Sequence, residues 1–176
     1  VDEAAPRLTR RRMPKQKPGQ SKQDYQTPIE FLDAVRRRFG LEAFALDVAS
    51  DEANHVAPLY YTAADNALAP ENGWTTRGGG FFWCNPPYSR IGPWVAKAWT
   101  ESRRGASGFV LIPAAVGANY WRDYVHGKAF VLLLNGRITF VGCTHGYPKD
   151  CVLLVYGPDV APGYEVWTWH ARTVEG

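Results

Sequence analysis

Apolar residues with helical spacing predict three helices, over residues 28–39, 93–104 and 118–125. The first has the clearest start, because residues 27–30 place a hydroxyl at the N-cap, a proline at the first helical position and a glutamate where a capping box requires one. Gly40 is expected to end this helix, since glycine readily adopts the backbone conformation of a helix C-cap. One side of the helix carries an apolar stripe and is predicted to be buried.

Short apolar runs between and after these helices predict the strands of a sheet. The runs are residues 43–47, 59–62, 81–84, 109–112, 129–134, 137–141, 151–156 and 164–169. Asn135-Gly136 is typical of a type I′ turn, so residues 129–141 predict an antiparallel hairpin. Helices alternate with strands first, and antiparallel strands come last. This order predicts an α/β fold with a mixed, mostly parallel sheet and a C-terminal antiparallel hairpin.

The composition is that of one globular domain. The chain has 176 residues, of which 45% are hydrophobic and 21% charged, and no apolar run approaches the ~20 residues that span a bilayer. Its three cysteines and four histidines lack the spacing of a disulfide framework or a zinc site. We therefore expect a reducing, cytoplasmic setting, no metal and no membrane partner. The oligomeric state is not indicated.

Positive charge is concentrated at the start of the chain. Residues 1–24 contain seven Lys or Arg against three Asp or Glu, whereas the remaining residues contain 13 against 14. We expect residues 1–24 to form a basic, disordered arm and residues 25–176 to form the folded domain. The arm is either an inert tail or a set of phosphate contacts with nucleic acid. The candidate contacts are Arg10, Arg11, Arg12, Lys15 and Lys17.

The strongest chemical signal is Asn85-Pro86-Pro87-Tyr88, which follows a predicted strand and precedes a predicted helix. Ligands of α/β sheets bind beyond the carboxyl ends of strands, where this segment lies. Two prolines stiffen the loop and remove two N–H donors. The side-chain carbonyl of Asn85 and the main-chain carbonyl of Pro86 are then able to accept both hydrogens of an amino group, and Tyr88 offers a ring for stacking. A rigid turn with a core tyrosine is the structural alternative.

This segment resembles the catalytic signature of S-adenosylmethionine-dependent amino methyltransferases. Further segments, in this order, resemble the phage-type DNA N6-adenine methyltransferase (Dam) family. They are residues 25–28, 44–49, 65–68, 93–95 and 136–140. The resemblance covers residues 24–156 and implies a Rossmann-like methyltransferase fold, S-adenosylmethionine as cofactor and double-stranded DNA as partner. It further implies a short target such as GATC, and a phage or prophage gene acting in the bacterial cytoplasm.

The resemblance also implies roles for single residues. Asn85, Pro86 and Pro87 would form the catalytic loop that holds the target amino group, and Tyr88 would stack on a flipped adenine. The cofactor-binding residues would be Thr27, Pro28, Asp47 and Asp65. As structural alternatives, Asp47 would cap a strand end and Asp65 would form an ordinary Asx turn. The chain departs from many methyltransferases in having no G-x-G loop after the first strand, where Ala49 and Ser50 stand instead.

The implied chemistry needs neither a metal nor a strong base. Two acceptors that pull on the N–H bonds favour a pyramidal nitrogen with an available lone pair, and a sulfonium activates the methyl group. Because the amino group of adenine lies inside a duplex, the base would be extruded first. Two alternatives stay open, namely methylation of an RNA base or of a protein glutamine, and a DNA-binding module without activity.

Overall fold

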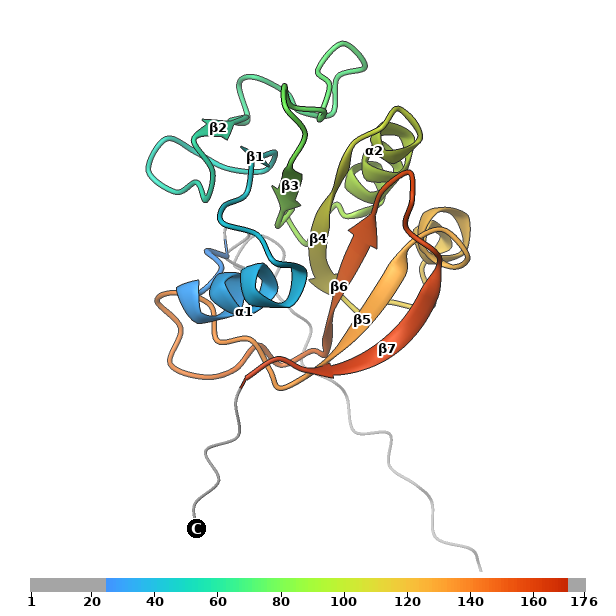
Figure 1. Ribbon diagram of the computed structural model, residues 1–176. Helices are drawn as coiled ribbons and strands as arrows, with labels where there is room; N and C mark the ends of the chain where they lie inside the picture. The colour runs from blue at the N-terminus through green and yellow to red at the C-terminus, as the bar shows by residue number, and fades with distance from the viewer. Residues whose placement is uncertain (1–24, 171–176) are drawn as a thin grey trace, which may run out of the picture.

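The computed structural model describes residues 25–170, which form one mixed sheet with helices on both faces (Figure 1). The helical elements are α1 (Ile29–Phe39), α2 (Gly92–Arg103) and the π-helical turn η1 (Trp121–Val125). The strands are β1 (Leu46–Asp47), β2 (Leu59–Tyr60), β3 (Phe81–Cys84), β4 (Ser107–Pro113), β5 (Phe130–Asn135), β6 (Cys151–Tyr156) and β7 (Gly163–Thr168). In the described part of the chain no helix is both long enough and apolar enough to cross a membrane.

The sheet has the strand order β2-β1-β3-β4-β6-β5-β7 across the described residues. Neighbours are parallel from β2 to β4, and β5 is parallel to β7. Only β6 runs against its two neighbours, β4 and β5, among these strands. The prediction of an α/β fold with a mixed, mostly parallel sheet is therefore confirmed.

The predicted hairpin over residues 129–141 is wrong. The first half forms β5, but its edges are taken by β6 and β7, which leaves no place for a strand at residues 137–141. Ile138 and Phe140 are buried, as their alternation indicates. Their segment nevertheless bonds elsewhere, because Tyr147 N–H donates to Ile138 O at 2.7 Å and Val141 N–H donates to Gln26 O at 3.0 Å. The sheet thus ends in the parallel strand β7 and not in a hairpin.

The helix predictions are confirmed for α1 and α2, with small shifts of their ends. Gly40 ends α1 in the left-handed conformation, with a φ of 65°. The N-cap of α1 is Pro28, and no side chain caps this end, so the expected capping box does not form. The third helix prediction is confirmed to within one residue, since residues 119–125 are helical and the π-helix η1 forms most of this stretch.

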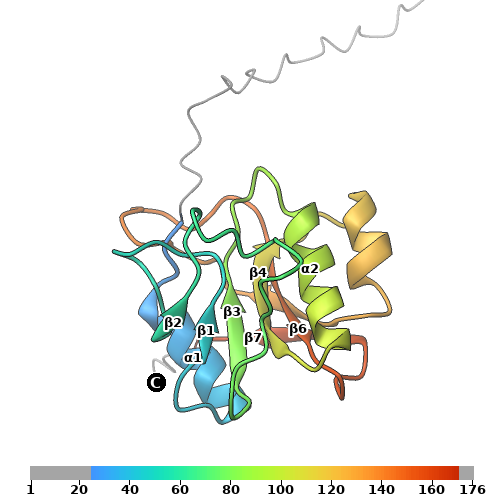
Figure 2. The same ribbon diagram turned by 90° about the horizontal axis from the view of Figure 1, so that it is seen from above.

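Two apolar layers hold the sheet between helices, as Figure 2 shows from above. On one face α1 packs its stripe of Phe31, Leu32 and Val35 against β3, β4 and β6. On the other face α2 and η1 cover the same strands. Alternation along β4 supplies both layers, because Phe109 and Leu111 face α1 while Val110 and Ile112 face α2.

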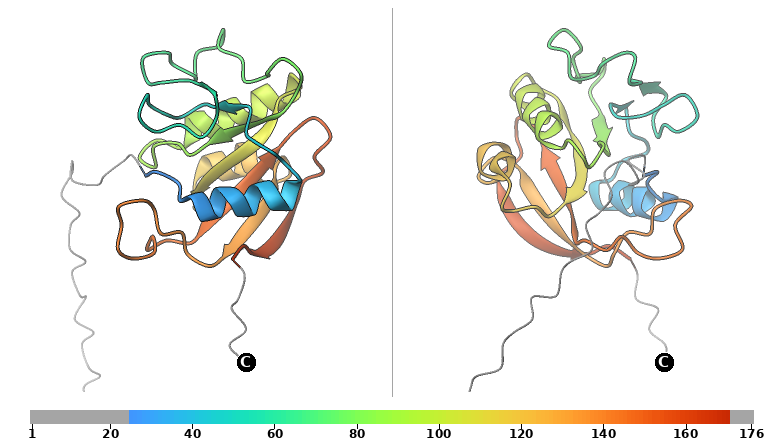
Figure 3. Two further views of the ribbon diagram at one scale, coloured as in Figure 1. Left: turned by 60° about the vertical axis from the view of Figure 1, so that its left-hand side comes forward. Right: turned by 180° about the vertical axis from the view of Figure 1, so that it is seen from behind.

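The direction of chain crossing reverses between β1 and β3. After β1 the chain moves outward to β2, and it then returns past β1 to form β3 on the opposite side. Long loops without a helix, residues 48–58 and 61–80, make these two connections (Figure 3). The carboxyl ends of β1 and β3 therefore border a topological switch point, where α/β sheets bind ligands.

Candidate active site

A cavity of about 420 Å³ lies at this switch point. Its walls come from residues 48–51 after β1, residues 61–63 and 66–68 after β2, and Asn85 and Pro87 after β3. Tyr25, Asn54 and Trp94 complete the lining. The size is within the range of small-molecule and cofactor sites. The predicted catalytic loop thus borders a space large enough for a small-molecule ligand.

The amide of Asn85 has a defined orientation in this wall. Its Nδ2 donates to Tyr25 O at 2.5 Å and to Thr27 Oγ1 at 3.0 Å. A main-chain carbonyl only accepts hydrogen bonds, so the group that faces Tyr25 is the amide nitrogen. The group on the other branch of the amide is the oxygen Oδ1, which is an acceptor. This is the chemistry that a bound amino group requires.

The prolines of the loop behave as the sequence indicates. Pro86 is buried and Pro87 is half-buried against the cavity. Neither residue carries an N–H, so the loop offers carbonyl oxygens without competing donors at these positions. Pro87 O accepts the N–H of Arg90 at 3.1 Å, which closes the turn before α2.

Tyr88 lies in an aromatic cluster with Tyr25, Phe140 and Tyr147. The centroid of its ring is 5.7 Å from that of Tyr25, 6.1 Å from Phe140 and 5.6 Å from Tyr147. Its hydroxyl is buried and has no hydrogen-bond partner within residues 25–170. Burial also raises the pKa of this hydroxyl well above its ordinary value. The ring, and not the hydroxyl, is therefore what this position supplies.

Asp47 holds the loop that follows β1 and carries part of the cavity lining. Its Oδ1 accepts Ala49 N–H at 3.2 Å and its Oδ2 accepts Val56 N–H at 3.0 Å, so the carboxylate shapes the loop that follows β1. Burial raises the pKa of Asp47 to about 6, although the two N–H groups act in the opposite direction. Asp47 is not among the residues that line the cavity. Its geometry is that of the strand-end cap.

Asp65 is likewise engaged in its own turn. Its Oδ2 accepts the N–H of Thr62 at 2.7 Å and the hydroxyl of Thr62 at 2.8 Å. These two bonds lower the pKa of Asp65. The carboxylate is exposed and lies outside the cavity lining, whereas its neighbours Thr62 and Asn66 belong to it.

Asp51 is a cavity residue that the sequence interpretation missed. Its Oδ1 accepts the N–H groups of Ala53 and Asn54, each at 2.8 Å. Asp51 could have been found from the sequence, because it lies in a polar turn four residues after the end of β1. The main chain turns here without glycine, because Ser50 N–H and Ser50 Oγ both donate to Tyr61 O. Ala49 and Ser50 thereby form part of the cavity wall.

Thr27 and Pro28 lie beside the catalytic loop and not in the cavity lining. Thr27 is 6% exposed, and its hydroxyl contacts the amide of Asn85. Pro28 precedes α1. The predicted DNA contacts Arg10, Arg11, Arg12, Lys15 and Lys17 lie outside the described residues. Within the described part of the chain, no group of three or more His, Cys, Asp or Glu side chains is placed to hold a metal ion.

Asn85 and Pro87 of the Asn-Pro-Pro-Tyr loop thus lie in the wall of a cavity at the switch point of a mixed α/β sheet. The family model of DNA N-6-adenine-methyltransferase (Dam) matches residues 15–152, and the chain belongs to this family. A DNA N-6-adenine-methyltransferase of Haemophilus phage HP1 (strain HP1c1) is 28% identical over 126 residues, which cover 70% of this chain and 69% of the relative. No solved structure matches the chain.

Proposed function

We propose that this protein transfers a methyl group from S-adenosylmethionine to the N6 amino group of adenine in double-stranded DNA. The observation that carries the proposal is the Asn85 amide, held by its nitrogen beside a cavity at the switch point. Membership of the Dam family and the name of the phage relative support the same reaction. A Rossmann-like arrangement fits the parallel strands β2, β1, β3 and β4.

The cavity suits S-adenosylmethionine in size and lining. Asp51, Asn54 and Asn66 offer polar atoms for an amino acid and a ribose, while Leu68 and Trp94 offer apolar surface for a nucleobase. We assign the cofactor to these residues, with Asp47 and Asp65 supporting the loops that carry them. S-adenosylmethionine, when bound, supplies a methyl group activated by a sulfonium.

The catalytic loop acts on the amino group of the target base. Asn85 Oδ1 and Pro86 O accept its two hydrogens, which favours a pyramidal nitrogen with its lone pair available. The two acceptors act most strongly on the charged nitrogen that develops during transfer, so they stabilise the transition state more than the ground state. The methyl–sulfur bond breaks as the nitrogen–carbon bond forms, which would leave S-adenosylhomocysteine. The charged nitrogen then releases its proton to water, so no strong base is required.

The target adenine has to leave the duplex before it reaches the loop. Extrusion costs a few kcal/mol, and stacking in the enzyme offsets part of this cost. The ring of Tyr88 supplies the stacking surface, next to Tyr25 and Tyr147. A buried hydroxyl without a partner is consistent with a role for the ring face alone.

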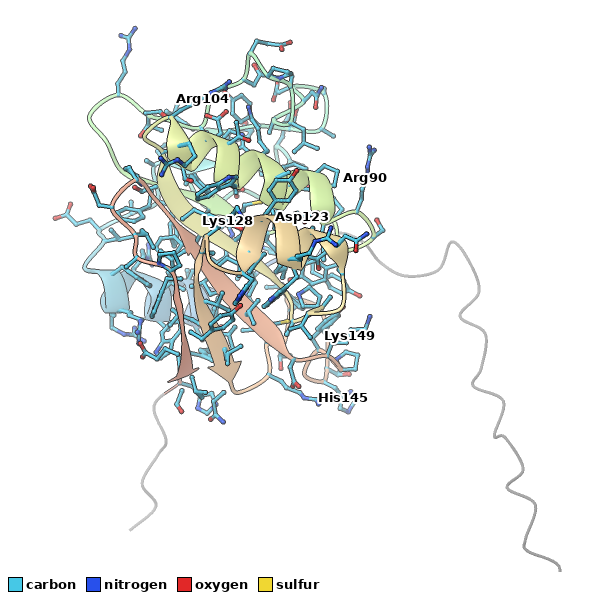
Figure 4. All side chains as sticks on the ribbon, turned by 90° about the vertical axis from the view of Figure 1, so that its right-hand side faces the viewer. Arg90, Arg104, Asp123, Lys128, His145 and Lys149 are labelled. Atoms are coloured by element: carbon cyan, nitrogen blue, oxygen red, sulfur yellow. The ribbon has the colours of Figure 1, made fainter. Side chains whose placement is uncertain are left out.

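Exposed cations next to the catalytic loop suit a DNA backbone. Arg90 follows the loop, and Lys149 belongs to the segment between β5 and β6. Both lie along the same side of the molecule in Figure 4. Each phosphate that such side chains neutralise releases counterions, which favours binding at low salt. The basic residues 1–24 would extend this contact.

The proposal is tested with radiolabelled S-adenosylmethionine and unmethylated DNA, RNA or protein. We expect label at adenine N6 of DNA, and oligonucleotides with and without GATC test the target site. Asn85→Ala should lower the single-turnover rate by at least ~10²-fold, the effect of removing one transition-state hydrogen bond. Asn135→Ala, which truncates an exposed asparagine at the end of β5, serves as the matched control. Label in RNA or protein only, or no transfer by the folded protein, would contradict the proposal.

A further inference from the structure

The segment immediately before α1 lies across the catalytic asparagine. Tyr25 O and Thr27 Oγ1 accept from Asn85 Nδ2 at 2.5 and 3.0 Å. The contact joins residues that are 58 and 60 positions apart in the sequence. It is therefore a tertiary contact made at the side chain that the proposed reaction depends on.

The segment is itself held in place by the loop after β5. Val141 N–H donates to Gln26 O at 3.0 Å. The ring of Tyr25 packs against those of Phe140 and Tyr147, with centroids 4.9 and 5.5 Å apart. The two acceptors thus have a supported position relative to Asn85.

We infer that Thr27 is a positioning residue, which acts with the Tyr25 carbonyl to hold the Asn85 amide with Oδ1 directed to the substrate amine. A primary amide can rotate by 180°, which exchanges its NH₂ group and its oxygen. In the rotated form NH₂ faces the substrate amine, donor meets donor, and one of the two acceptors of the reaction is lost. This inference rests on the proposed function.

A role for Thr27 in starting α1 does not account for these contacts. No side chain caps the helix, so the Thr27 hydroxyl is not part of its N-terminal hydrogen bonding. Valine has nearly the same shape as threonine and keeps the packing of a side chain that is 6% exposed. Thr27→Val therefore removes the acceptor without removing a cap.

The kinetic test compares Thr27→Val and Thr27→Ser in the full chain, with DNA and S-adenosylmethionine as substrates. We expect kcat to fall about tenfold in Thr27→Val, the scale of one net hydrogen bond, with both KM values within about twofold. Thr27→Ser keeps the acceptor and should restore kcat to within about twofold. Thr100→Val removes an exposed hydroxyl that donates to Ala96 O on α2, and it should leave kcat and both KM values unchanged. An unchanged kcat in Thr27→Val, or an equal loss in Thr27→Ser, would overturn the inference.

A second measurement does not depend on activity. Hydrogen exchange of the side-chain NH₂ groups, followed by NMR, should show the Asn85 amide protons to be protected relative to those of the exposed Asn135. Thr27→Val should release the proton that Thr27 accepts. Fast exchange of Asn85 in the unmodified protein would overturn the inference. Protected protons in a protein that methylates no DNA would instead reject the proposed function and leave the positioning intact.

Discussion

A buried ion pair on α2 anchors one wall of the cavity, and breaking it should destabilise the protein strongly. Lys97 Nζ lies 2.6 Å from Glu101 Oε1 and also donates to Ala69 O at 3.1 Å. Glu101 Oε2 accepts the N–H of Trp74 at 3.1 Å. The pair thus ties both ends of the loop over residues 69–74 to α2, directly after the cavity residues 66–68.

The size of the effect follows from burial. In Lys97→Met the apolar stem of the side chain is kept, but Glu101, which is 1% exposed, loses the ammonium that compensates its charge. Removing one partner of a buried pair costs about 3–5 kcal/mol of the free energy of unfolding. Arg104→Ala is the matched control, because it removes a guanidinium that is itself 57% exposed and lies 3.4 Å from the same carboxylate. Its cost should stay below about 1 kcal/mol.

Urea denaturation followed by circular dichroism measures both variants. A further variant, Lys97→Met with Glu101→Leu, should recover part of the loss, since no buried charge remains. It still leaves Trp74 N–H without its acceptor, which costs about 1–3 kcal/mol. Equal losses in Lys97→Met and Arg104→Ala would refute this reasoning, because burial would then not decide the cost. S-adenosylmethionine affinity, measured by calorimetry, should fall in Lys97→Met and stay unchanged in Arg104→Ala.

Three further predictions concern the base site, pH and the N-terminal residues. Tyr88→Phe should change kcat/KM only slightly and stabilise the protein by about 1 kcal/mol, since the buried hydroxyl has no partner in the described chain. Tyr88→Ala should lower kcat/KM strongly on paired DNA and less on adenine opposite a mismatch. An equal defect on paired and mismatched DNA would reject base stacking. Burial raises the pKa of Asp47 from 3.8 to about 6, so the folded state binds this proton more tightly than the unfolded state does. The stability that this group contributes is therefore greatest below pH 3.8, and about 3 kcal/mol is lost as the pH rises through 6. Urea unfolding between pH 4 and 7 measures this loss. If Asp47→Asn shows the same dependence of unfolding free energy on pH, other groups cause it. Deleting residues 1–22 should weaken DNA binding and flatten the dependence of log K on log salt, while methyl transfer at saturating DNA persists. An unchanged slope would show that these residues make no phosphate contacts.

Elements whose burial is encoded by a local pattern were predictable from the amino-acid sequence. The stripe of α1, the apolar runs of β3 and β4, and Gly40 as a C-cap each follow from a period or a turn preference within a few residues. The loop that we propose to be catalytic was also predictable, because two prolines between an asparagine and a tyrosine are a local signal. Because the loop follows a predicted strand, it was expected at the edge of the sheet where ligands bind.

Tertiary structure decided which groups meet. Residues 137–141 alternate like a strand, yet β6 and β7 occupy both edges of β5, and no local pattern reports that competition. The Thr27 hydroxyl fits a capping box in sequence, but it accepts a hydrogen bond from the amide of Asn85, 58 residues away. Lys97 and Glu101 appear as an ordinary charged pair on a helix, and only the packing of residues 69–74 over them makes them a buried anchor.

The difference between predictable elements and unpredictable contacts has one physical cause. The period of apolar residues specifies which face of an element is buried, because that face has to leave water wherever the element packs. Hydrogen-bond partners are chosen by competition among all donors and acceptors that the fold brings within reach, so they depend on long-range geometry. In this protein the presence of an asparagine at the end of β3 is local information, whereas the orientation of the Asn85 amide is a property of the whole fold.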